Sequence, residues 1–451
     1  MRRRPRFLLA LFGISLGAPT ALASGFSVAR FGGEAGHPTA DNPTVVYYNP
    51  AALTQSSDRR LFLDLNLAYR RVTYDRHAEP SDVPPPPDAP DANTGRATLS
   101  DWLAAPTLGV SGNAGRFSFG LLGYVPFGAP VSWESREEYE HQSRLPGPVD
   151  GVQRWHSIEG SFITFQLSGA LAYRFEPARL SAGVTLSFVH TLLEDVRARA
   201  DGTNDVEREG RSLISARGSA LAAGLGVLWE ALPGELVLGA SYQSRPNFAG
   251  GMELSGTVDN RIGTESRADV DVTYDLPDVF RLGGRYRPEP GLELRLFGDY
   301  TRWSAFERQC IVNAGRECEL AADGSQPSGG AVLQNLRRNF HDAIEVRAGI
   351  SRYFSSGTEY FAGAGVMTSA VPDETLEAGL ADFAGASFTL GARARLYEGV
   401  AVSLAYTQFV FAPRTVESTL AEPPLPTRQP DASGTYKQFV GVANANIDFR
   451  W

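Results

Sequence analysis

The stretch "ITFQLSGALAY", residues 163–173, alternates apolar side chains with polar or small ones. Ile163, Phe165 and Leu167 fall on one face of an extended chain, and Thr164 and Gln166 fall on the other. A period of two is typical of a β-strand with one apolar and one polar face. The stretch therefore predicts a strand, and the architecture depends on what its apolar face contacts.

The same alternation recurs along the chain, in residues 61–69, 182–188, 292–300, 402–410 and 439–451. Beyond the N-terminus there is no apolar run of about eighteen residues, which argues against a membrane-spanning helix. Two architectures produce such strands. A soluble sandwich or solenoid buries the apolar face in a core, whereas an outer-membrane barrel turns it toward lipid and keeps the polar face in its lumen.

The lengths of the connections favour the barrel. Short turns at one end and long loops at the other are typical of outer-membrane barrels. Long polar connections are expected at 75–96, 131–155 and 304–338. Short turns are expected at 113–116, 175–180, 231–235, 287–291, 354–359 and 396–400.

Aromatic side chains near the ends of the expected strands also favour the barrel, because such residues suit the two membrane interfaces. The chain ends in an alternating strand whose last residue is Trp451. A terminal aromatic residue resembles the signal read by the outer-membrane insertion machinery, which we expect as a partner during assembly. The aromatic set is Tyr69, Tyr74, Tyr173, Phe175, Tyr242, Tyr286, Tyr300, Trp303, Tyr353 and Tyr406.

These patterns predict an all-β protein in which residues 60–451 form a transmembrane antiparallel β-barrel of about 14 strands. An even number suits a single-chain bacterial barrel. We treat Leu276-Pro277 as a bulge within one strand, because a split would leave an unpaired edge in lipid. The expected strands are 60–75, 98–113, 116–126, 158–175, 179–197, 208–230, 235–256, 266–287, 291–304, 340–354, 358–370, 385–396, 400–412 and 434–451.

The first residues, 1–23, have the pattern of a secretory signal peptide. Four arginines within residues 2–6 precede the apolar stretch "FLLALFGISLG", and "ALA" at 21–23 is a small-residue cleavage site. A membrane anchor is the alternative, but the apolar run is short for a span. Removal of the four arginines takes the formal net charge from −9 to −13, which argues against nucleic acid as a partner. We expect the outer membrane of a Gram-negative cell as the location.

Residues 24–59 precede the first expected strand and show no period. A barrel of about fourteen strands encloses a lumen that leaks unless something fills it. We therefore predict that residues 24–59 form a plug inside the lumen. Within it, "VVYYNPAALT", residues 45–54, looks at first like a strand that ends in a turn. In a plug, Asn49-Pro50 is instead a bend that holds Tyr47 and Tyr48 inside the barrel.

The segment "SGFSVARFGGEAGHPTADNPTVVYYNPAALT" resembles the N-terminal hatch of the FadL-type outer-membrane transporters of long-chain fatty acids and aromatic hydrocarbons. Phe26 and the tripeptide Asn49, Pro50 and Ala51 stand where the family pattern has them. "GYVPFGAPVSW", residues 123–133, resembles the kinked third strand of that family. Stretches that resemble later strands are 238–256, 276–286, 297–306 and 339–354.

The resemblance implies uptake of hydrophobic compounds into the outer-membrane lipid, and we expect long-chain fatty acids as ligands. Aromatic hydrocarbons taken up by the same route, or a general porin, are the alternatives. Phe26 would contact the ligand or else anchor the hatch, and Asn49, Pro50 and Ala51 would shape the hatch. A lateral exit is implied where the third strand kinks, although the same residues could be a strand end that runs into a loop. The kink residues are Pro126, Phe127, Gly128 and Pro130.

Arginines recur on the polar faces of the expected strands. One of them could pair with a ligand carboxylate, but we expect acidic residues across the lumen to balance them, because unpaired buried charge is costly. The arginines are Arg70, Arg174, Arg281, Arg285 and Arg347, and the expected acidic partners are Asp64, Glu293, Asp299 and Glu345.

Cys310 and Cys318 are close in sequence, and in an exported protein we expect a disulfide between them, with free thiols as the alternative. His156 and Ser157 are neighbours and point to opposite faces of a strand, which argues against a lipase site. The six histidines have no metal-ligand spacing. We therefore expect no catalytic residue, no metal and no cofactor. We also expect the protein to be a monomer.

Overall fold

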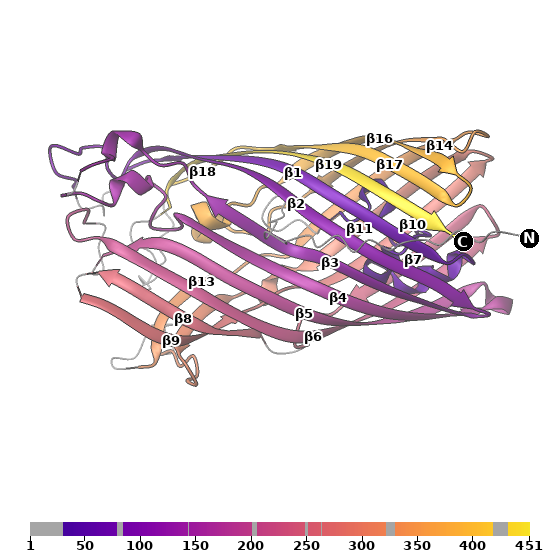
Figure 1. Cartoon of the computed structure of the whole chain (residues 1–451), viewed down its shortest axis with the longest axis horizontal. Helices are drawn as coiled ribbons and strands as arrows, with labels where there is room; N and C mark the ends of the chain where they lie inside the picture. The colour runs from indigo at the N-terminus through magenta and orange to yellow at the C-terminus, as the bar shows by residue number, and fades with distance from the viewer. Residues whose placement is uncertain are drawn as a thin grey trace, which may run out of the picture.

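The computed structural model describes residues 30–78, 84–142, 144–200, 205–248, 251–262, 264–321, 330–417 and 432–451. The expected signal peptide and Phe26 lie outside the described residues. The strands form one antiparallel sheet that closes on itself, because β1 (Arg60–Arg76) pairs with both β2 (Gly95–Ala114) and the last strand, β19 (Gly434–Arg450). The result is a barrel with oblique strands and the C-terminus at one end (Figure 1).

The other elements occupy the chain as follows. The remaining strands are β3 (Phe117–Ser132), β4 (Glu159–Phe175), β5 (Leu180–Arg199), β6 (Gly210–Leu232), β7 (Leu236–Gln243), β8 (Met252–Ile262), β9 (Thr264–Tyr274), β10 (Asp278–Glu289), β11 (Leu292–Arg302), β12 (Arg308–Asn313), β13 (Val332–Arg337), β14 (Ala343–Tyr353), β15 (Glu359–Met367), β16 (Gly385–Tyr397), β17 (Val400–Phe411) and β18 (Arg414–Val416). The helical turns are η1 (Gly33–Ala35), α1 (Val45–Tyr48), η2 (Pro50–Gln55), η3 (Glu137–Tyr139), η4 (Pro148–Asp150), η5 (Glu176–Ala178), η6 (Trp303–Ala305), η7 (Asp373–Thr375) and η8 (Ala378–Leu380). No helix of the described residues is both long and apolar enough to cross a membrane.

The nineteen strand segments of the described chain form a closed barrel of 14 wall strands, which is the predicted number. Five wall strands consist of two segments each: β7 with β8, β9 with β10, β11 with β12, β13 with β14, and β17 with β18. Strand β6, for example, pairs with both β7 and β8. Pro277 lies in the interruption between β9 and β10, so the treatment of residues 266–287 as one wall strand is confirmed.

Two predicted boundaries are wrong. The connection predicted at 304–338 is partly wall, because β12 pairs with β9 and β13 pairs with β12. These segments have six residues each, which is too short for a period of two to stand out. The strand predicted at 235–256 ends too early, because the wall strand made of β7 and β8 continues to Ile262, with an interruption between Gln243 and Met252.

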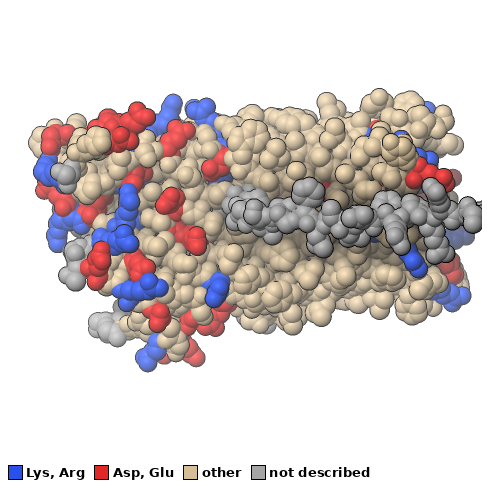
Figure 2. All heavy atoms as spheres, in the orientation of Figure 1, with Lys and Arg blue, Asp and Glu red and all other residues tan. Residues whose placement is uncertain are grey.

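Side-chain exposure distinguishes the barrel from a soluble sandwich. On β4 the side chains of Phe165, Leu167 and Leu171 are 44%, 50% and 49% exposed, whereas Thr164 and Ser168 are fully buried. A sandwich would show the reverse pattern. The exterior is therefore apolar and the interior polar, as in a membrane barrel. On the visible face, charged side chains gather toward the two ends and leave a belt between them (Figure 2).

The two ends of the barrel differ as predicted. Tight turns, such as those at 113–116 and 396–400, join strands at the end that carries the C-terminus, which we term the turn end (Figure 1). Long connections occupy the opposite end, which we term the loop end. Two aromatic residues predicted at the membrane interfaces lie elsewhere, because Tyr74 and Trp303 are buried in the large apolar cluster inside the loop end.

Candidate functional site

Residues 30–59, which we term the N-terminal segment, lie inside the barrel. The side chains of Val45, Tyr48 and Ala51 are fully buried, and η2 contacts β3, β4, β5 and β6. Residues 45–54, whose sequence looks at first like a strand, form one helical turn, α1, followed by η2. Asn49 separates the two with an extended backbone (φ −168°, ψ 102°), because a residue before proline avoids the helical region.

The side chain of Asn49 fixes this bend and joins it to the wall. Its Nδ2 donates to the carbonyl oxygens of Pro38 at 3.0 Å and Val227 at 2.9 Å. Its Oδ1 accepts a hydrogen bond from the backbone N–H of Ala51 at 3.1 Å. The side chain of Asn49 therefore joins the tripeptide Asn49–Ala51 both to the rest of the N-terminal segment and to β6.

Three inward-facing glycines, Gly183, Gly226 and Gly239, allow the bend to approach the wall closely, and we term them the glycine seat. A Cβ atom on Gly226 would lie 2.0 Å from Asn49 Oδ1. A Cβ atom on Gly183 would lie 2.5 Å from the backbone nitrogen of Ala51, and one on Gly239 would lie 2.7 Å from the oxygen of Pro38. Such distances exclude any side chain at these positions unless the backbone shifts.

An aromatic cluster continues this contact toward β3. Phe31, Tyr47 and Tyr124 pack edge to face, with ring centroids 4.9–5.1 Å apart. The guanidinium of Arg281 lies 4.0 Å from the centroid of the Tyr47 ring and donates a hydrogen bond to the main-chain carbonyl oxygen of Tyr47 at 3.1 Å. Cation–π contact and hydrogen bonding therefore attach the N-terminal segment to β10 as well.

Lumen charges are balanced largely as expected. Asp299 lies 3.5 Å from Arg281 and 3.6 Å from Arg347, and Glu293 lies 3.8 Å from Arg285. Glu345 forms an ion pair with Arg30 of the N-terminal segment. The segment therefore takes part in the charge network of the wall.

Three charged residues differ from this expectation. Arg174 lies near the turn end and pairs with Glu230 at 2.9 Å. Asp64 accepts a hydrogen bond from the backbone N–H of Gly32 at 2.8 Å instead of pairing with a predicted arginine. The partner of Arg70 is Asp101, whose carboxylate is 3.7 Å away.

The barrel wall is interrupted between β2 and β3. Their pairing runs from Ala114↔Phe117 to Leu108↔Gly123 and stops there. Farther toward the loop end, one isolated bridge between Leu99 and Trp133 joins the two strands in the described part of the chain. We term the space between residues 100–107 of β2 and 124–132 of β3 the window.

Prolines explain the window. Pro126 and Pro130 on β3 and Pro106 on β2 have no N–H group, so they cannot complete a ladder of hydrogen bonds. Strand β3 remains paired with β4, but the register shifts between Tyr124 and Phe127. Because β3 continues to Ser132, the predicted kink residues lie within the strand and along one edge of the window.

A cavity of about 110 Å³, which we term the loop-end cavity, adjoins the window inside the barrel. Two aromatic pairs shape it, Phe162 stacked on Tyr274 at 4.4 Å and Phe127 against Trp303 at 5.8 Å. Its lining also includes Gly128, Val131, Leu193, Leu276, Leu380 and the polar residues Arg70, His156, Asp195, Arg197, Arg338 and Glu377.

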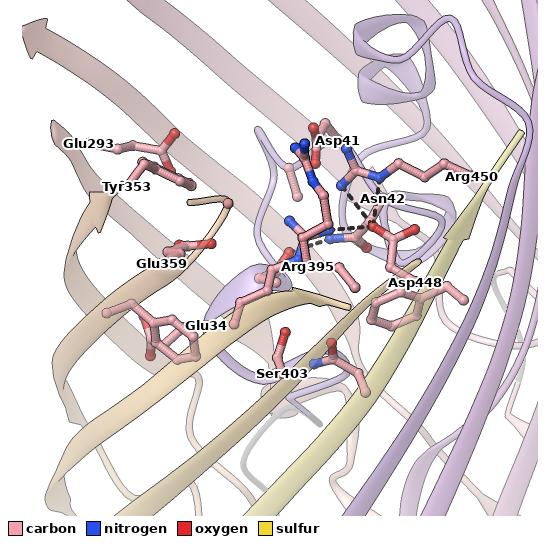
Figure 3. Close-up of a pocket in the computed structure, with 18 of the residues that line it drawn as sticks. Glu34, Asp41, Asn42, Glu293, Tyr353, Glu359, Arg395, Ser403, Asp448 and Arg450 are labelled. Atoms are coloured by element: carbon pink, nitrogen blue, oxygen red, sulfur yellow. Dashed lines mark hydrogen bonds and ion pairs between the residues drawn. The ribbon is translucent and has the colours of Figure 1, made fainter. Parts of the chain in front are cut away.

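A second cavity of about 650 Å³, the turn-end cavity, lies on the other side of the N-terminal segment and is shown in Figure 3. Glu34 and Asp41 of the segment face it, as do Glu293 and Glu359 of the wall. Arg450 donates a hydrogen bond to Asp448 across its edge at 2.8 Å. This lining is charged, which makes the turn-end cavity a poor environment for an apolar molecule.

The structure therefore brings part of the predicted site together. The kink residues line the window, and Phe127 and Gly128 also line the loop-end cavity. The tripeptide Asn49–Ala51 lies deeper in the barrel against the glycine seat. Cys310 and Cys318 are bonded to each other at the loop end, with their Cα atoms 6.3 Å apart.

Sequence reasoning missed Pro106, which faces the predicted kink from the neighbouring strand. The signal was available, because a proline within an alternating stretch indicates an edge or an interruption. Sequence reasoning also could not select one lumen arginine over the others. That choice depends on which arginine lies beside the window and the loop-end cavity, and only the packing determines it.

Comparison with known proteins identifies the family. No curated protein matches the sequence. The model of the family described as outer membrane protein transport protein (OMPP1/FadL/TodX) matches residues 14–449. The chain belongs to this family. The FadL/TodX family consists of outer-membrane channels that transport hydrophobic compounds, so this member is an outer-membrane transporter and not an enzyme.

Solved structures of FadL/TodX proteins share the fold. A Pseudomonas aeruginosa FadL homologue is 16% identical with a TM-score of 0.74, over 96% of this chain and 98% of that one. The Ralstonia pickettii toluene transporter TbuX is 14% identical with a TM-score of 0.61, over 94% and 97%. The P. putida toluene transporter TodX is 14% identical with a TM-score of 0.61, over 91% and 94%. At these identities the similarity concerns the fold alone.

Proposed function

We propose that this FadL/TodX-family protein takes up long-chain fatty acids and releases them sideways, through the window, into the outer-membrane lipid. The observation that carries the proposal is the position of the window beside the loop-end cavity, with Phe127 and Gly128 belonging to both. A hydrogen-bonded wall is closed to lateral passage, whereas an interruption next to an aromatic cavity leaves an apolar molecule a way out of the lumen.

The surroundings of the window support this route. On the lipid-facing side, an apolar groove of about 900 Å³ reaches Thr107 and Gly123 at the edge of the window. In the opposite direction, the N-terminal segment and the charged turn-end cavity lie between the loop-end cavity and the turn end. An apolar molecule that leaves through the window passes from one apolar environment to another and avoids hydration.

We propose that residues 24–59 act as the hatch. The hydrogen bonds of Asn49 and the close contacts of Pro50 and Ala51 with the glycine seat support this role. Contact between Phe26 and the ligand remains a prediction. A filled lumen argues against the general porin, which needs an open polar channel.

Aromatic hydrocarbons are the second candidate ligands, and the size of the loop-end cavity favours them. It measures about 110 Å³. An engineered apolar cavity of about 150 Å³ holds benzene, whereas sites for larger ligands usually measure about 300–1,000 Å³. TbuX and TodX are toluene transporters by their titles. A fatty acid would place one part of its chain in the cavity and the rest in the window.

We further propose that the protein works as a monomer and that its last strand is the signal for the insertion machinery. Trp451 is 67% exposed beside the closing pair of β1 and β19, where a recognition factor can reach it. Deletion of Trp451 should lower the amount of assembled barrel in the membrane.

An uptake assay tests the function directly. Cells that lack their own transporters, with and without this protein, receive radiolabelled oleate or toluene in lipid-free medium. Faster oleate entry supports the proposal, and faster toluene entry alone supports the second candidate. If neither compound enters faster, the uptake proposal is wrong, and a large stable conductance in planar bilayers would indicate a porin.

A further inference from the structure

We infer that Arg70 recognises the acidic head group of the ligand and that this recognition releases β3, which opens the window. The inference rests on the lateral exit proposed above and adds a residue that selects the ligand. A carboxylate would replace the oxygen of Pro130 as the acceptor for the Arg70 guanidinium. Molecules without an acidic group would leave the window closed.

The first step of the argument is the position of Arg70. It belongs to β1, where it stands opposite Asp101 of β2 in the register. Its buried side chain passes β2, and Nη2 donates a hydrogen bond to the oxygen of Pro130 on β3 at 2.8 Å. Pro130 lies in the part of β3 that has no ladder to β2. One side chain of β1 thus ties the free edge of β3 across the window.

Asp101 of β2 stands beside this tie, with its carboxylate 3.7 Å from Arg70. In the loop-end half of the window, the side chain of Arg70 takes the place of missing backbone hydrogen bonds. This contact can break without disturbing the ladder elsewhere.

The second step is the spare hydrogen-bonding capacity of Arg70. Three arginines line the loop-end cavity. Arg197 donates to Asp195 at 2.7 Å, and Arg338 donates to Glu377 at 2.7 Å. The carboxylate nearest to Arg70 is 3.7 Å away, beyond hydrogen-bond distance. Its Nε has no hydrogen-bond partner among the described residues, nor does Oδ2 of Asp101.

A buried guanidinium with an unused donor favours an incoming carboxylate. Bonds between arginine and a carboxylate are charge-assisted and can be bidentate, which makes them stronger than a bond to a main-chain carbonyl. A ligand carboxylate would therefore displace the main-chain oxygen of Pro130 as the acceptor for Arg70. A neutral hydrocarbon or an ester has no comparable group.

The third step is the place of the apolar part of the ligand. The rings of Phe127, Phe162 and Tyr274 line the same cavity as Arg70. A ligand with its carboxylate at Arg70 would therefore lay its chain against these rings and toward the window. This arrangement requires an apolar molecule with one acidic end.

Binding of oleate and of methyl oleate to the purified full-length protein tests the recognition. The wild type should bind oleate at least about tenfold more tightly than the ester, the effect of one hydrogen bond to a charged group. Arg70→Met should bring the ratio near one through weaker oleate binding, with ester binding as the measure of correct folding. Arg96→Met is the matched control, because Arg96 is exposed on β2 and pairs with Asp75. A ratio unchanged by Arg70→Met overturns the inference.

Spin labels test the opening of the window. Trp102→Cys on β2 and Ser132→Cys on β3 carry the labels, since both side chains are exposed and the native cysteines are bonded to each other. Oleate should widen the label distance, methyl oleate should not, and Arg70→Met should abolish the response. No widening with oleate overturns the coupling.

Uptake separates this inference from the proposed function. If no labelled compound enters faster with the wild type, the proposed function itself fails. If the wild type takes up oleate, and Arg70→Met takes up oleate and methyl oleate in the wild-type proportion, the inference about Arg70 is wrong and the proposed function is unaffected.

Discussion

The side-chain nitrogen of Asn49 donates a hydrogen bond to the main-chain oxygen of Val227, 2.9 Å away in wall strand β6. This contact joins the N-terminal segment to the barrel at the tripeptide Asn49–Ala51. The same nitrogen donates to the main-chain oxygen of Pro38 within the segment, so one substitution at Asn49 removes both contacts.

Asn49→Ala should loosen the N-terminal segment. Both carbonyl oxygens would lose their donor inside the barrel, at a cost of about 1–3 kcal/mol. We expect more frequent current openings in planar bilayers and faster proteolysis of the segment. Ser57→Ala is the control, because Ser57 is exposed at the end of the same segment. A silent bilayer trace for Asn49→Ala would show that other contacts suffice to seal the lumen.

Gly226→Ala should displace the bend from the glycine seat. The new methyl group would lie 2.0 Å from Asn49 Oδ1, so the segment or the wall must shift, at about 1–3 kcal/mol. Ion conductance should rise while the barrel stays folded. Gly224→Ala is a matched control on the same face of β6, because its methyl group would meet its nearest atom at an ordinary 3.4 Å. Equal conductance in the two variants would contradict the role of the glycine seat in holding the bend.

A reducible cross-link across the window should stop uptake. Cysteines in place of Trp102 and Ser132, joined by a short reagent, would hold β2 and β3 together. Oleate uptake should fall to background and return after reduction. The control links Leu167→Cys to Phe188→Cys, two exposed positions paired in the continuous ladder of β4 and β5. Normal uptake with the window linked would exclude lateral exit.

Acid should weaken the seating of the N-terminal segment through His37. Burial, reinforced by Arg295, Arg285 and Arg347, holds the pKa of His37 well below its usual value, and Asp41 opposes this shift weakly. The seated state therefore keeps His37 neutral, whereas a released segment would bind a proton near the ordinary pKa of about 6.5. Release of the segment is therefore coupled to proton uptake by His37, and the seated state loses stability as the pH falls below that value.

Conductance measured between about pH 7.5 and pH 5 checks this effect. The wild type should conduct more as the pH falls, and His37→Gln should flatten the profile. His77→Gln is the control, because His77 is exposed in a loop-end connection. A flat conductance profile for the wild type would show that protonation of His37 does not affect the seating of the segment.

Much of the fold follows from local pattern. Strands such as 163–173 show a period of two over a long range, and pairing partners are then set by chain order in an up-and-down barrel. Short segments such as Arg308–Asn313 carry no readable period, and their place in the wall depends on their neighbour β9. Tyr74 is a different case, because the alternation of β1 places it on the same inward face as Asp64 and Arg70, so its direction was readable from the sequence.

The site was predictable only in part. The prolines and the glycine within residues 126–130 indicated where β3 cannot complete its pairing, because their effects on the backbone do not depend on their neighbours. The glycine seat could not be found in this way, because Gly183, Gly226 and Gly239 read as ordinary strand glycines until the N-terminal segment is placed against them.

The sequence by itself determined the alternating strands, the turn chemistry and the break at Asn49-Pro50, because each depends on residues close together in the chain. Only the tertiary structure decided that β2 and β3 separate over part of their length and that Arg70 reaches Pro130 across this gap. The order β1–β2–β3 in the sheet brings residues 60 positions apart to within a hydrogen bond. No local pattern encodes which of several lumen arginines the packing places beside the window.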